Sequence, residues 1–96
     1  MQKFEWDDEK DIINRRKHGV SFEEAATVFN DENGIFLDDP DHSETEDRFL
    51  LIGFSETARL LLVCHCYREN DAVIRIISAR KATTREKAFY GEQFYA

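Results

Sequence analysis

The stretch VIRIISARKATTREK, residues 73 to 87, contains a β-strand followed by the start of a helix. Its first half is rich in β-branched residues, which predicts a strand from Val73 to about Ala79. Thr83 and Glu86 then have the spacing of a capping box, so we expect a helix to open at Thr83. The stretch carries five cations against one acid, whereas the whole chain has a formal net charge of −7. This local excess of cations indicates either internal ion pairs or an anion-binding site.

The segments before this stretch predict further strands. Apolar runs cover residues 48–54 and 59–67, and a shorter run covers residues 35–37. The connections at 55–58 and 68–71 are short, so we expect neighbouring strands to be antiparallel. The near-continuous hydrophobicity of these runs predicts a sheet that is covered on much of both faces.

A helix is expected ahead of the strands, close to the N-terminus. It begins with a cap at Asp7 or Asp8 and runs to about Lys17, and Gly19 is the expected stop. Acids in its first turn and bases in its last turn suit the helix dipole. The side chains expected to face the core are those of Trp6, Ile12, Ile13 and the stem of Arg16.

A second helix is expected to begin at Ser21. Ser21 and Glu24 have the spacing of a capping box, in which each side chain bonds the backbone of the other residue. The residues at helical spacing that should face the core are Phe22, Ala25, Ala26 and Phe29. The helix should fray near Asn30, where poor helix formers begin.

These elements predict one α+β domain over residues 1–96, in the order ααββββα. Two N-terminal helices should pack on a mainly antiparallel sheet of about four strands, and a C-terminal helix should follow. With 42% hydrophobic residues, the chain can build one core. We see neither a bilayer-spanning apolar run nor the apolar centre of a secretory signal, so a cytoplasmic location without membrane contact is expected.

Charge and cysteine spacing limit the chemistry. Residues 1–48 hold fifteen Asp/Glu and six Lys/Arg, whereas residues 49–96 hold five and seven. Contact with nucleic acid is therefore expected from the second half and from the basic run at residues 15–17.

Cys64 and Cys66 are too far apart on one strand for an unstrained disulfide, so we expect two reduced thiols. The histidines match no zinc spacing, and neither a metal nor a cofactor is expected.

Arg75, Arg80 and Lys81 are the candidate phosphate-binding residues. Arg80 and Lys81 precede the expected helix start at Thr83, where free backbone N–H groups favour an anion. Strict alternation along a strand places Arg75 and Arg80 on opposite faces, so a bulge near Ser78 is needed to bring them together. The alternative for each cation is an ion pair with a nearby carboxylate.

The histidines allow two interpretations. His65 stands alone among apolar residues and is the candidate group for proton transfer. The alternative is a buried histidine whose hydrogen bond is satisfied within the core. His18 is expected to cap the C-terminal end of the first helix, and His42 to lie in a solvated turn.

Three separated segments resemble the BrnT family of bacterial type II toxins. They are residues 4–7 (FEWD), 16–25 (RKHGVSFEEA) and 75–83 (RIISARKAT), accompanied by the DPDH motif at residues 39–42 and the Arg85-Glu86 pair. The resemblance implies a RelE-like fold and an endoribonuclease activity that stops translation. It also implies neutralisation by a BrnA antitoxin, which is a ribbon-helix-helix protein. The complex would repress its own operon, so that the toxin reaches operator DNA only through the antitoxin.

These observations lead to two hypotheses of different classes. In the first, the chain cleaves RNA without a metal. Arg75, Arg80 and Lys81 then stabilise the phosphoryl oxygens, His65 transfers a proton, and Arg85 and Lys87 hold flanking backbone phosphates. In the second, the chain is a non-catalytic module whose acidic face, residues 31–47, docks a basic partner protein.

Overall fold

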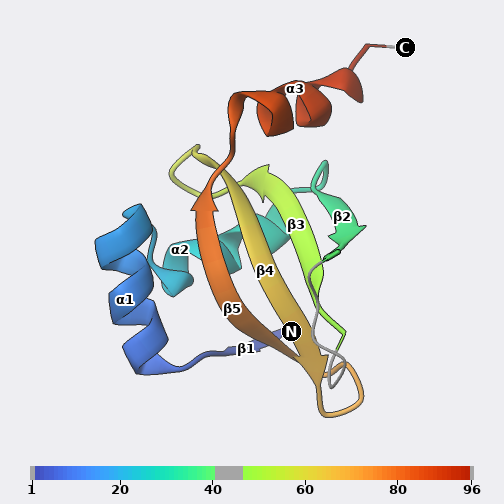
Figure 1. The fold of residues 1–96 in the computed structure, drawn as a ribbon. Helices are drawn as coiled ribbons and strands as arrows, with labels where there is room; N and C mark the ends of the chain where they lie inside the picture. Colours follow the sequence, from blue (N-terminus) through green and yellow to red (C-terminus); the bar gives the residue numbers. More distant parts are fainter. Residues whose placement is uncertain (1, 41–46, 96) are drawn as a thin grey trace.

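The computed structural model describes residues 2–40 and 47–95, and these form one five-stranded sheet with three α-helices and a short 3-10 helix (Figure 1). Their bounds are β1 Lys3–Glu5, α1 Asp8–His18, α2 Phe22–Thr27, η1 Val28–Asn30, β2 Ile35–Asp38, β3 Phe49–Phe54, β4 Leu60–Arg68, β5 Val73–Lys81 and α3 Thr84–Glu92. The α+β class is confirmed. His42 lies outside the described residues.

The strands occur in the order β1-β5-β4-β3-β2. The pairs β3–β4 and β4–β5 are antiparallel, as predicted. Strand β2 is also antiparallel to β3, whereas β1 pairs with β5 in parallel. The sequence interpretation missed β1, so the sheet has five strands rather than about four. Three residues are too few to show an alternating pattern, and the pairing partner of Phe4 is Ile74, at the far end of the chain.

Helix α1 begins and ends as predicted, but its buried face differs from the predicted one. Asp7 caps it, and Gly19 ends it with a φ of 69°. Ile12 and Ile13 are 40% and 59% exposed, whereas Asn14 is 6% exposed. The expectation that both isoleucines face the core is therefore wrong.

The reason is that α1 lies beside the edge of β5 (Figure 1), where backbone groups need hydrogen-bond partners. The Nδ2 of Asn14 donates to the carbonyl oxygens of Val20 and Ala79, both at 2.8 Å. Its Oδ1 accepts from the Ala79 N–H at 3.1 Å. Strand β1 pairs only with residues 73–75 and leaves the rest of this edge of β5 without a neighbouring strand. The side chain of Asn14 supplies hydrogen-bond partners there.

Helix α2 covers one face of the sheet, as its spacing predicts. Phe22 and Ala25 are fully buried, and Val20 and Val28 join them. They pack on strand residues in a cluster that also contains Leu51, Leu61, Val63, Ile76 and Ala79. The α-helix gives way to η1 at Val28, close to the predicted fraying point.

The opposite face has a smaller cover. There α3 contributes one buried residue, Tyr90, which packs with Ile52 and Leu62. The hydroxyl of Tyr90 donates to Asp31 at 2.7 Å, and this bond helps to hold α3 at one end of the sheet (Figure 1). Much of this face therefore lacks a helical cover among the described residues.

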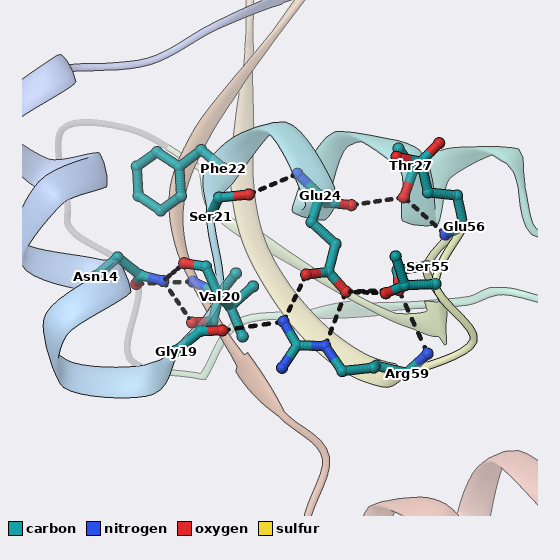
Figure 2. Close-up of polar contacts among 12 residues, drawn as sticks. Asn14, Gly19, Val20, Ser21, Phe22, Glu24, Thr27, Ser55, Glu56 and Arg59 are labelled. Atoms are coloured by element: carbon teal, nitrogen blue, oxygen red, sulfur yellow. Dashed lines mark hydrogen bonds and ion pairs between the residues drawn. The ribbon is translucent and has the colours of Figure 1, made fainter.

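Glu24 links α2 to the β3–β4 hairpin (Figure 2). Ser21 caps the helix through the Glu24 N–H at 3.0 Å, but the Glu24 carboxylate does not complete the predicted capping box. It accepts instead from Ser55 and Thr57 at 2.7 Å and from Nε of Arg59 at 2.9 Å. The hydrogen bonds from Arg59 are the largest cause that lowers the pKa of Glu24 to about 2. The second predicted capping box, Thr83 with Glu86, is complete.

Candidate active site

Strand β5 contains one more residue than the segment of β4 that it faces. His65 pairs with Ile76, and the preceding residue Cys64 pairs with Ser78. Ile77 is left without a pairing partner, which is the pattern of a β-bulge. The bulge lies next to the position at which the sequence interpretation required one.

The bulge reverses the alternation and brings Arg75 and Arg80 to one face. Arg75 lies opposite Cys66, and Arg80 lies opposite Leu62. These two β4 residues are an even number of positions apart, and paired residues share a face. Both guanidinium groups therefore belong to the face that α2 does not cover.

Each of the two arginines forms an ion pair. Nη1 of Arg75 lies 3.1 Å from the carboxylate of Glu5, which is its register partner on β1. Arg80 binds Glu86 through two hydrogen bonds, of 2.8 and 3.0 Å. The ion-pair interpretation therefore describes the resting contacts of both residues.

The ion pair does not use all of Arg80. Its Nη1 also donates to the Lys81 carbonyl at 3.2 Å, so three of the five N–H donors of the guanidinium are used in described contacts. The hydrogen bonds with Glu86 raise the pKa of Arg80 and lower the pKa of Glu86. Glu86 therefore holds a permanent cation in a fixed orientation and leaves two donors for another ligand.

Arg80 lines a cleft of about 450 Å³ on this face. Arg48 and His18 enter the same cleft from the start of β3 and the end of α1. The remaining lining residues are Asp39, Pro40, Leu50, Leu62, Cys64, Ser78 and Ala79. Two arginines and a histidine, separated widely in the sequence, thus line one concave surface of an acidic protein, together with one acid, Asp39.

The thiol in this cleft is unsuited to nucleophilic chemistry. Sγ of Cys64 lies 3.5 Å from a carboxylate oxygen of Asp39. Burial, and then the carboxylate of Asp39, raise the pKa of Cys64 to about 11. The group is therefore a neutral thiol at physiological pH. Cys64 and Cys66 are both free, as predicted.

His65 lies on the opposite face from the two arginines and is 0% exposed. Its ring is surrounded by Phe29, Phe36, Phe49 and Tyr67, with centroid distances from 4.8 to 6.1 Å. Burial lowers its pKa, and its Nε2 has no hydrogen-bond partner among the described residues. His65 therefore does not meet the cations in one pocket, as the nuclease hypothesis expected, because aromatic rings from η1, β2, β3 and β4 enclose it in the core.

The other predicted cations are also dispersed. Lys81 pairs with Leu61, which places it on the opposite face from Arg80. Arg85 and Lys87 are exposed on α3. Lys81 and Lys87 line a second groove, which shares no lining residue with the cleft that contains Arg80.

The acidic surface of the second hypothesis, residues 31–47, includes 41–46, which lie outside the described residues. Two of its other acids have internal contacts. Asp31 accepts hydrogen bonds from Phe54 N–H and the Tyr90 hydroxyl, and Asp39 accepts one from Cys64. These carboxylates stabilise the fold as well as contributing charge.

Sequence reasoning placed His18 at the end of a helix and overlooked Arg48. Both residues reach the cleft only through tertiary packing, since α1 lies along β5 and β3 lies two strands away from it. The one sequence signal was that His18 falls inside the segment 16–25 used for the family resemblance.

Within residues 2–40 and 47–95, no group of three His, Cys, Asp or Glu side chains is placed to hold a metal ion. None of the described helices is both long and apolar enough to cross a membrane.

The fold is that of a small ribonuclease toxin. It superposes on the crystal structure of the Brucella abortus ribonuclease toxin BrnT with a TM-score of 0.63 and 21% sequence identity, over 88% of this chain and 100% of that chain. A family model described as "Ribonuclease toxin, BrnT, of type II toxin-antitoxin system" matches residues 6–86. The chain therefore belongs to the BrnT family, and the predicted resemblance is confirmed. No curated protein matches the sequence significantly.

Proposed function

We propose that this chain is an endoribonuclease that cleaves RNA without a metal ion, at the cleft formed by His18, Arg48 and Arg80. Membership in a family of ribonuclease toxins supports the activity. The proposed location rests on one observation, namely that these three residues line a single cleft on a chain with a net charge of −7. Cations kept together in an acidic protein suit a ligand with a negative charge.

The proposed reaction is an internal phosphoryl transfer. The ribose 2′-oxygen forms a bond to the neighbouring phosphorus, and the bond from phosphorus to the 5′-oxygen breaks. The 2′-hydroxyl loses its proton to a base, and the departing 5′-oxygen gains one, so the products are a cyclic phosphate and a 5′-hydroxyl. The step needs no co-reactant. It needs cations at the phosphoryl oxygens and a group that transfers a proton.

Arg80 is the proposed phosphate ligand, because two of its N–H donors are left over from the Glu86 ion pair. Arg48 supplies a second positive charge in the same cleft. His18 takes the proton-transfer role that the sequence suggested for His65, because His18 is half-buried at the cleft and His65 is enclosed. Preorganised cations of this kind contribute on the order of 3–4 kcal/mol each to the transition state.

The other predicted residues have outer roles in this proposal. Arg85 and Lys87 are exposed on α3 and would contact flanking backbone phosphates. Arg75 lies on the same face as Arg80 but does not line the cleft, so we assign it to RNA positioning. Lys81 projects from the opposite face at the end of β5 and would act on the backbone rather than at the reacting phosphate.

The biological setting of the proposal follows from the family. A toxin of a type II system has an antitoxin, and we propose a BrnA-type ribbon-helix-helix protein in that role. RNA cleavage would inhibit translation in the cytoplasm, and operator DNA would be contacted only through the antitoxin complex. Expression alone should arrest growth, and co-expression with the antitoxin should restore it. A non-catalytic binding module would be harmless in both conditions.

The direct test is cleavage of a labelled single-stranded RNA by the purified protein in excess chelator. We expect cleavage by the unmodified protein, and a loss of roughly 100-fold or more in Arg80→Ala and in His18→Ala. Lys10→Ala removes an exposed cation from α1, outside the cleft, and should cleave normally. Full activity of Arg80→Ala would contradict the assignment of the cleft, and dependence on an added divalent metal would contradict the mechanism.

A further inference from the structure

A second concave surface lies between α3 and the β3–β4 hairpin, which we call the α3 groove. Its volume is about 660 Å³, larger than that of the cleft at Arg80. The residues that line it are Phe54, Ala58, Arg59, Leu60, Lys81, Lys87, Tyr90, Gly91 and Phe94. The proposed cleavage reaction uses none of the apolar residues among them.

The floor of the α3 groove is aromatic and accessible. Phe54 is 43% exposed and Phe94 is 56% exposed, although both are large apolar side chains. Tyr90 lies between them, with ring centroids 5.3 Å from Phe54 and 5.7 Å from Phe94. Exposed aromatic residues that gather in a groove mark a binding surface.

The charges around the groove have one sign. Arg59 is engaged with Glu24 and with the Gly19 carbonyl. Lys81 and Lys87 have no ion-pair partner among the described residues, and no acid lines the groove. An occupant that carries carboxylates would therefore meet complementary charge.

The aromatic rings favour a protein occupant over RNA. A nucleobase binds between or upon free ring faces. Here the rings of Phe54 and Tyr90 contact each other edge to face at 86°, and Tyr90 and Phe94 are tilted at 59°. They form a continuous apolar floor, which suits the side chains of an amphipathic segment laid along the groove.

We infer that the α3 groove binds an acidic amphipathic segment of the antitoxin, with its apolar side chains on Phe54 and Phe94 and its carboxylates at Lys81 and Lys87. That an antitoxin exists follows from the family. The occupant would also cover Lys81 and Lys87, which are two of the proposed contacts to the RNA backbone. The consequence for neutralisation rests on the proposed nuclease function, whereas the docking itself does not.

The test compares two apolar residues of similar exposure. Phe94→Ser changes the groove, and Ile13→Ser changes α1, where Ile13 is 59% exposed. Binding of the antitoxin encoded beside the toxin gene is measured by calorimetry, and cleavage of single-stranded RNA is measured for each variant. We expect Phe94→Ser to raise the Kd by about 30-fold or more and to remain a nuclease that escapes neutralisation. Ile13→Ser should change the Kd by less than about threefold.

Two results would overturn the inference. One is an unchanged Kd for Phe94→Ser with normal RNA cleavage, which would leave the groove without a role in docking. The other is an unchanged Kd with loss of RNA cleavage, which would assign the groove to RNA. An unmodified toxin that cleaves no RNA but loses antitoxin affinity through Phe94→Ser would contradict the proposed function alone.

Hydrogen exchange of the unmodified complex gives a readout that needs no variant. We expect new protection in residues 54–60 and 84–94 when the antitoxin binds. Salt should weaken the complex, since Lys81 and Lys87 are exposed. Protection confined to other segments, such as β2, would refute the docking site.

Discussion

Replacing Glu24 with glutamine tests whether the contact between α2 and the β3–β4 hairpin contributes substantially to stability. The side chain of Glu24 is 14% exposed, and its carboxylate accepts hydrogen bonds from Ser55, Thr57 and Arg59. These bonds, led by those of Arg59, lower its pKa from 4.5 to about 2. One pKa unit corresponds to roughly 1.4 kcal/mol, so the charged form contributes about 3 kcal/mol to folding at pH 7.

The pH dependence of this contribution has a definite sign. Because the pKa is lower in the folded protein, the contribution is complete above the unfolded value of 4.5 and is lost as pH falls toward 2. About 40% of it should be gone by pH 3.5. Glutamine cannot titrate, so the difference in unfolding free energy between the unmodified protein and Glu24→Gln should shrink across the same range.

The assay is urea denaturation of both proteins at several pH values between 7 and 3.5. Glu23→Gln is the matched control, because Glu23 is the exposed neighbour on the same helix turn, and it should change stability by less than about 0.5 kcal/mol. A cost below about 1 kcal/mol for Glu24→Gln at pH 7 would refute the reasoning. A difference that stays constant down to pH 3.5 would also refute it.

Three further substitutions test other parts of the fold. Asn14→Leu should lower the unfolding free energy, measured by urea denaturation, by about 3–5 kcal/mol, because it leaves the N–H and C=O of Ala79 buried without partners. A loss under about 1 kcal/mol would contradict the contact between Asn14 and the edge of β5. His65→Leu should remain within about 1.5 kcal/mol of the unmodified protein in unfolding free energy at pH 7. The unmodified protein should lose stability below about pH 6.5, because the pKa of His65 is lowered in the folded state, and the variant should not; if both proteins lose stability equally there, His65 is not the cause. Tyr90→Phe should lower the unfolding free energy by about 1–2 kcal/mol below pH 10, and equal melting curves would show that the hydrogen bond to Asp31 contributes little. The unmodified protein should lose stability between pH 10 and 12, because the pKa of Tyr90 is raised to about 12 in the folded state, and the variant should not.

Local signals in the sequence were sufficient for much of the fold. Caps at Asp7 and Thr83 and the αL glycine at Gly19 are decided by neighbouring residues, and each occurs as predicted. The antiparallel order of β3, β4 and β5 follows from the short connections between them. Glu24 shows the limit of such reasoning, because its carboxylate prefers an arginine 35 residues away to the backbone of its own helix.

The predictions that failed are those that tertiary packing decides. Isoleucine at positions 12 and 13 suggested a core face, but the neighbour of α1 is a strand edge that needs polar partners, which only Asn14 supplies. The alternation of β4 correctly separates His65 from Cys64 and Cys66, yet it does not reveal which face the helices cover. His18 reaches the cleft because α1 lies beside β5, and no spacing within the sequence encodes that approach.

The unpaired Ile77 has a consequence for how this protein tolerates changes in chain length. Shortening β5 by one residue at that position would restore a regular ladder, in which Arg75 and Arg80 are four positions apart on one face and Ala79 still packs beneath α2. Replacing the Ile77 side chain would leave this geometry intact. Deletion scanning should therefore find β5 tolerant at this position, whereas removing one residue from the regular ladder of β4 would turn the residues beyond it to the opposite face.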